Sequence, residues 1–135
     1  MAAETPLYRK AATPTLEQAF HVRKTFTGGQ TDDTFTVSNP ANSVTALSTA
    51  DASTQYAIEV MTVSLSAAAT LTLANASGGG GTASVIWGPH AFAAAGVYTV
   101  YFPRGLLVGD AKTIYYTNSA GNGTIELWGA RVPVN

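Results

Sequence analysis

The residues that could do acid–base or metal chemistry are few and lie far apart along the chain. His21 and His90 are the two histidines, and their spacing does not form a metal site. A catalytic set could be assembled from Ser84, His90 and Asp110, but the chain lacks the Gly-x-Ser-x-Gly turn that presents a nucleophilic serine. We therefore predict no catalytic residue and no metal ligand.

Two further patterns resemble binding motifs but lack essential residues. The glycines at 78–81 are not followed by the Lys-Ser/Thr of a phosphate-binding loop, nor by a helical pattern. Asp32 and Asp33 are adjacent acids, and strand geometry would send them to opposite faces rather than into one cleft. Cysteine is absent, which excludes disulfides and thiolate zinc sites. The sequence thus predicts a non-enzymatic protein without a cofactor.

Aromatic side chains are the remaining candidates for binding, and 9 of the 13 fall between residues 56 and 128. They could form a sugar-stacking platform, or they could pack in the core and between subunits. We favour packing because they are spread over several expected strands. The aromatics predicted to line a subunit interface are Trp87, Tyr98, Tyr101, Tyr115 and Trp128.

Composition points to one domain covered largely by partners. The chain has 135 residues, and only 11% are charged, against about 25% in typical soluble domains. A surface with so few charges is suited to contact with other subunits. The formal net charge of −1 argues against a nucleic-acid ligand, and we expect no membrane-spanning segment.

The first 30 residues are expected to form an arm, and residues 31–135 the body. Prolines at 6 and 14 interrupt regular structure, glycines at 28 and 29 resemble a hinge, and a capping box at Thr15–Gln18 predicts a short helix over 15–22. Burying five apolar side chains at ~1.5–3 kcal/mol each cannot offset ordering some two dozen residues at ~1–2 kcal/mol each. The arm is also basic, so it should dock on a neighbour. The residues predicted to do so are Leu7, Tyr8, Arg9, Lys10, Leu16, Phe20, Arg23 and Lys24.

From residue 31 the pattern changes to short strands separated by turn residues. The most strand-like segments are 97–102 and 112–117, joined by a loop that begins at Pro103, and Asn122-Gly123 predicts a hairpin turn of type I′. About eight strands at regular spacing, with almost no helix, are typical of an antiparallel β-sandwich or jelly roll. We therefore expect an all-β, jelly-roll-like sandwich with an extended N-terminal arm.

The style of these strands and turns carries a resemblance. It covers about residues 56–132, notably 58–66, 70–73, 87–89, 95–98, 102–106 and 124–132. The motifs that carry it are the Ala-Gly-x-Tyr strand entry at 95–98 and the Pro-x-Gly-Leu turn at 103–106. These segments resemble the small β-sandwich decoration, or cement, proteins of tailed-bacteriophage heads. Related sandwiches also occur in phage tail and fibre proteins.

The resemblance implies a structural virion protein. Decoration proteins form trimers or comparable oligomers on the outside of the capsid, and their arms clamp neighbouring shell subunits. The implied partners are the major capsid protein and copies of the chain itself, as a homotrimer, assembled in the bacterial host cytoplasm. The alternative is a tail or fibre module that binds carbohydrate or a receptor through exposed aromatics.

Overall fold

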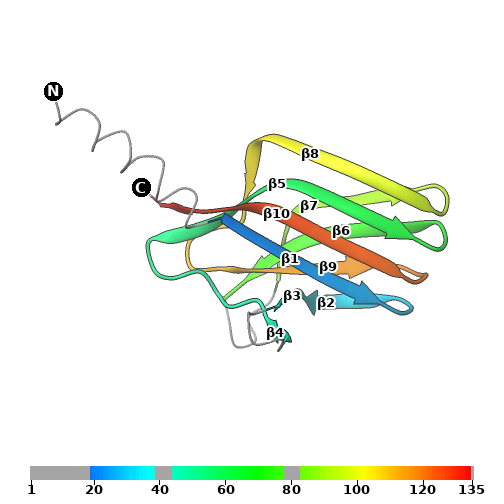
Figure 1. Ribbon diagram of the computed structural model, residues 1–135, viewed down its shortest axis with the longest axis horizontal. Coiled ribbons are helices and arrows are strands. Elements are labelled where there is room, and N and C mark those ends of the chain that lie inside the picture. Colours follow the sequence, from blue (N-terminus) through cyan, green and yellow to red (C-terminus); the bar gives the residue numbers. More distant parts are fainter. Residues whose placement is uncertain (1–18, 39–43, 78–82, 135) are drawn as a thin grey trace, which may run out of the picture.

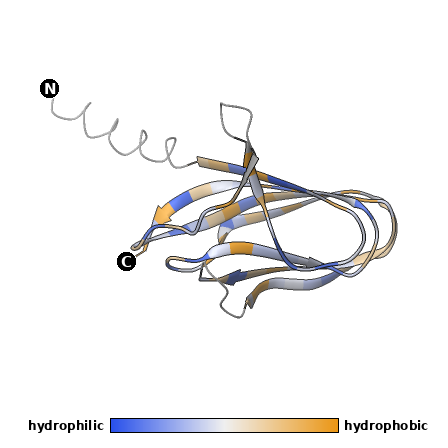
Figure 2. Ribbon diagram, turned by 90° about the horizontal axis from the view of Figure 1, so that it is seen from below, coloured by the Kyte–Doolittle hydropathy of each residue, from blue (hydrophilic) through white to orange (hydrophobic). Residues whose placement is uncertain are grey.

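The protein forms two antiparallel β-sheets packed face to face, as a computed structural model shows (Figures 1 and 2). The model describes residues 19–38, 44–77 and 83–134. The strands in these ranges are β1 Ala19–Phe26, β2 Gln30–Thr34, β3 Thr36–Ser38, β4 Val44–Ala46, β5 Thr54–Leu65, β6 Ala69–Ala76, β7 Ser84–Phe92, β8 Gly96–Leu107, β9 Thr113–Asn118 and β10 Gly123–Pro133. The predicted all-β sandwich is confirmed.

The strand order is that of a jelly roll. One sheet has the order β4-β3-β1-β10-β5-β8 and the other β2-β9-β6-β7. Leaving aside the short β3 and β4, which extend the first sheet beside β1, every connection except β6–β7 passes from one sheet to the other. Two four-stranded sheets linked in this way define a jelly roll, and β8 lies at the upper edge of the six-stranded sheet in Figure 1.

The core lies between the sheets and is built by strand alternation. On β1, Val22 and Phe26 point inward while the residues between them are exposed or half-buried. The largest fully buried side chains come from both sheets: Tyr56, Tyr116, Phe35, Ile58, Met61, Leu71, Leu73, Ile114, Ile125 and Leu127. In Figure 2 apolar and polar residues accordingly alternate along the strands.

The expected boundary of the arm at residue 30 is wrong. Residues 19–26 form β1, which lies between β3 and β10 and pairs with β10 along its whole length. The expected helix over 15–22 is likewise replaced by strand from Ala19 onward, and residues 1–18 lie outside the described residues. The strand is favoured over the expected helix because pairing with β10 provides partners for the backbone N–H and C=O groups and buries Val22 and Phe26.

A bulge at Glu59 changes the faces of β5 from those that simple alternation predicts. The register with β10 shifts so that Gly129 faces Ile58 while Trp128 faces Val60, which leaves Glu59 as an extra residue. Ile58 therefore points into the core, and Val60 points outward.

The prolines and the Asn-Gly pair also act differently from expectation. Pro103 does not end its strand, since β8 continues to Leu107, and Pro89 lies within β7 after a cis peptide bond. Both strands are end strands, where a residue without an N–H is tolerated. The predicted type I′ hairpin at Asn122-Gly123 does not form, because β9 and β10 belong to different sheets and the positive φ falls at Gly121.

Candidate interaction surfaces

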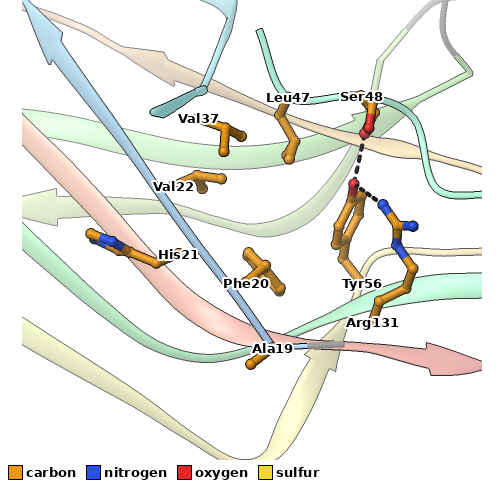
Figure 3. A pocket seen from close by; sticks show the side chains of 9 residues that line it. All are labelled: Ala19, Phe20, His21, Val22, Val37, Leu47, Ser48, Tyr56 and Arg131. Carbon is orange, nitrogen blue, oxygen red and sulfur yellow. Dashed lines mark hydrogen bonds between the residues drawn. The ribbon is translucent and has the colours of Figure 1, made fainter. Parts of the chain in front are cut away.

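A pocket of about 390 Å³ opens beside the first residues of β1 (Figure 3). Residues 1–18 are joined covalently to the body at this rim, because Ala19 lines the pocket. The apolar lining residues are Ala19, Phe20, Val22, Val37 and Leu47, and the polar ones are His21, Ser48, Tyr56 and Arg131. The volume suits the side chains of a peptide segment or a small ligand.

The polar wall of the pocket is a fixed hydrogen-bonded group. The Tyr56 hydroxyl donates to the carbonyl oxygen of Ser48 at 2.7 Å and accepts from Nη2 of Arg131 at 3.0 Å, as the dashed lines in Figure 3 show. The same guanidinium lies 3.3 Å from the Asp51 carboxylate and 5.2 Å from the centre of the Tyr56 ring. Phe20 packs edge-on against that ring at 5.0 Å. These contacts orient Tyr56 and Arg131 before anything enters the pocket.

The outer face of the six-stranded sheet, meaning the face turned away from the four-stranded sheet, carries a row of apolar and aromatic side chains. Pairing places His21 opposite Trp128, Trp128 opposite Val60 and Val60 opposite Tyr101. The His21 and Trp128 rings stack at 4.8 Å, and Nε2 of His21 lies 2.7 Å from the Glu126 carboxylate. Trp128 is 37% exposed and Tyr101 70% exposed, so the row is available to a partner.

The open edge of the same sheet is formed by β8. Five large hydrophobic residues are well exposed among those that the structure describes, and Val97, Tyr101 and Leu107 of this set lie on β8. Val97 is 72% exposed. Within the described ranges no strand pairs with the outer side of β8, so its backbone donors and acceptors face outward.

A charged cluster holds the two sheets together at the opposite side of the sandwich. The buried Tyr116 hydroxyl donates to Asp33 at 2.8 Å, the Thr34 N–H donates to the same carboxylate at 2.9 Å, and Lys24 lies 3.4 Å away. Burial raises the pKa of Asp33, but the hydrogen bonds and the Lys24 charge outweigh it, so this pKa lies below its usual value. Burial and the Asp33 charge together raise the pKa of Tyr116. The cluster therefore has a structural role: the Lys24–Asp33 ion pair joins β1 to β2, and the Tyr116 hydrogen bond joins β2 to β9.

The described residues that were predicted for the arm lie in three different parts of the body and form no common surface. Phe20 forms part of the pocket wall, Arg23 is exposed on the outer face, and Lys24 belongs to the ion-pair cluster. The other predicted arm residues, Leu7, Tyr8, Arg9, Lys10 and Leu16, lie outside the described residues.

The aromatics predicted for a subunit interface divide between the outside and the interior. Tyr101 and Trp128 are exposed in the outer-face row. Trp87 is half-buried against Phe102, and Tyr98 packs on Phe92 and donates to the Ala94 carbonyl oxygen at 2.6 Å. Tyr115 is half-buried and alternates with the inward-facing Tyr116.

Sequence reasoning missed both the pocket and the edge. Tyr56 and Arg131 are 75 residues apart and meet only through the pairing of β5 with β10, so no local pattern marks them. The edge did leave a signal. Residues 96–102 contain no charge, and the Pro103 that follows fits an end strand as well as it fits the strand end expected from the sequence.

The residues that the structure describes contain no group of three or more His, Asp or Glu side chains placed to hold a metal ion. They also contain no helix with the length and hydrophobicity needed to cross a membrane.

The jelly-roll assignment depends on the strand order, because comparison with known proteins gives only weak similarities. No protein-family model and no curated protein matches the chain. Two solved structures of the coat protein of tobacco streak virus, one in a C2 crystal form and one described as a dimer, are 9% and 10% identical. They have TM-scores of 0.32 and 0.33, with 87% of this chain and 89% and 90% of theirs covered. A structure of infectious bursal disease virus, Gx strain, is 12% identical with a TM-score of 0.33, covering 87% of this chain and 37% of that one. Similarities this low carry no argument about function.

Proposed function

We propose that this protein is a non-enzymatic structural component of a virus particle, which binds the outer surface of a phage capsid and stabilises it by bridging shell subunits. The observation that carries the proposal is that the six-stranded sheet of a jelly roll presents three separate contact surfaces. They are the pocket at the root of residues 1–18, the apolar row on the outer face, and the open edge of β8, which is uncharged over residues 96–102. Jelly rolls are common in capsid proteins, which supports the proposal.

The attachment would combine several weak contacts. Residues 1–18 would reach from Ala19 to a shell subunit or a neighbouring copy, with Leu7 and Tyr8 giving apolar contact and Arg9 and Lys10 giving charge. The pocket beside Ala19 would receive the corresponding segment of a neighbour. Association of copies, expected as a homotrimer, would multiply these contacts and raise the overall affinity for the shell.

Co-sedimentation with capsids that lack this protein tests the attachment. The full chain should sediment with the capsids, and a chain that begins at Ala19 should stay in the supernatant while keeping its fold. Replacing Arg9 and Lys10 with alanine should weaken binding mainly at low salt, and replacing Leu7 and Tyr8 should weaken it at all salt concentrations. Equal binding by the full and shortened chains would refute the docking of residues 1–18.

A second candidate is a carbohydrate- or receptor-binding module of a phage tail or fibre. It is favoured by the exposed row of His21, Trp128 and Tyr101 beside the Glu126 carboxylate, since aromatic rings and acids commonly bind sugars. Screening the body against a glycan array would test it. Binding that is lost in Trp128→Ala but kept in Tyr115→Ala would support this candidate over the capsid role.

A further inference from the structure

The four sheet edges of the sandwich differ in how they are protected against pairing. β4 has only three residues, and β2 carries Asp32 and Asp33 together with a register shift. β7 contains Gly88-Pro89, and its register with β6 shifts twice. Short length, charge, proline and bulges are the usual devices that prevent edge-to-edge association.

β8 has none of these devices over residues 96–102. This stretch contains no charge and no proline, and it pairs with β5 without a break from Gly96 to Tyr101. Val97, Thr99 and Tyr101 point to the outer face and are exposed, whereas Tyr98, Val100 and Phe102 are half-buried. An edge of this kind is suited to pairing with another strand.

The sequence of β8 is complementary to itself in the antiparallel direction. If a two-fold axis passes through Thr99, then Val97 of one copy lies opposite Tyr101 of the other, and the two Thr99 side chains face each other. An aromatic residue opposite a β-branched one, and Thr opposite Thr, are both favourable cross-strand pairs. Gly96 falls opposite Phe102, so this register uses the whole stretch up to Pro103, which cannot donate to the ladder.

We propose that the open edge of β8 pairs with β8 of a second copy, antiparallel and centred on Thr99, to join two six-stranded sheets into one continuous sheet. This contact is isologous, since the same residues serve on both sides. It goes beyond the capsid attachment proposed above and does not depend on it. Where copies also associate as trimers, the two-fold contact would link one trimer to the next.

The mass of the full chain in solution, measured by analytical ultracentrifugation over a concentration series, tests the contact. The wild type should form assemblies with an even number of 13.9 kDa chains. Thr99→Lys places two like charges opposite each other on the axis, so the mass should halve and the dissociation constant should rise at least about tenfold. Thr25→Lys adds the same charge to an exposed position on the outer face of β1 and should leave the mass unchanged.

Cysteine cross-linking provides a second measurement that does not depend on charge. The chain contains no cysteine, so a single introduced thiol can cross-link only to another copy. Thr99→Cys should give a disulfide-linked dimer under mild oxidation, and Thr25→Cys should not. An odd-numbered or monomeric wild type, or a mass that Thr99→Lys leaves unchanged, would overturn the edge contact. A trimer unaffected by Thr99→Lys would do so while leaving the capsid role in place.

Discussion

Truncation of the N-terminus should have a sharp boundary at residue 19, because β1 is an interior strand of the six-stranded sheet. A chain that begins at Ala19 keeps all eight residues of β1, and every residue of the described core lies at Val22 or later. A chain that begins at residue 25 loses six of those eight residues, including Phe20 and Val22. The first truncation should therefore fold as the full chain does, and the second should not.

The size of the second effect follows from burial. Val22 is 1% exposed, and fully burying such a side chain contributes about 1.5–3 kcal/mol, while half-buried Phe20 contributes roughly half as much. Losing both removes about 2–4.5 kcal/mol, and the uncovered edge of β10 loses its ladder partners as well. A domain of ordinary stability has only about 5–15 kcal/mol in total, so the shorter chain should be unfolded or aggregated.

Urea unfolding followed by tryptophan fluorescence measures both truncations. Trp128 reports directly on this region, because it lies opposite His21 of β1. As a matched pair in the full chain, Val22→Ala should cost about 2 kcal/mol and Thr25→Ala less than about 0.5 kcal/mol. If the chain that begins at residue 25 unfolds within about 1 kcal/mol of the one that begins at Ala19, the assignment of β1 to the body is refuted.

Three further predictions concern the interior. Tyr116→Phe removes a buried hydrogen bond to a carboxylate and should lower the free energy of unfolding by about 1.5–3 kcal/mol; no change in the urea midpoint would contradict this. The pKa of Asp33 is lower in the folded state than the usual aspartate value of 3.8, so its stabilising contribution is present above that pH and is lost as pH falls toward the folded-state pKa. The stability difference between wild type and Asp33→Asn should therefore shrink below pH 3.8, and a difference independent of pH would count against the cluster. Gly129→Ala would place a methyl group onto the Ala57 carbonyl oxygen and 2.9 Å from the Phe20 ring, and should lower stability by about 1–3 kcal/mol, as thermal unfolding can measure.

The body of the fold was predictable because its signals are local. Alternation of apolar residues and regular turn residues between strands predicted the sandwich. β1 also carried a period-two pattern, with Phe20, Val22 and Phe26 on one face. Lys24 interrupts that pattern, because its inward-facing ammonium is paired with Asp33 from the other sheet.

What could not be predicted depends on contacts between distant strands. The bulge at Glu59 becomes visible only when β5 is paired with both β10 and β8. The pocket needs Tyr56 and Arg131 from strands far apart in sequence. Pro103 in β8 predicts a strand end as readily as an edge strand, because the position of β8 at the edge of the sheet depends on topology and not on the local sequence.

The most direct test of the proposed function is the copy number of this chain in purified phage particles, measured by quantitative mass spectrometry against the major shell protein. A capsid-stabilising role predicts a copy number comparable to that of the shell protein. A few copies per particle would contradict that role and favour the tail or fibre module, and absence from particles would contradict both.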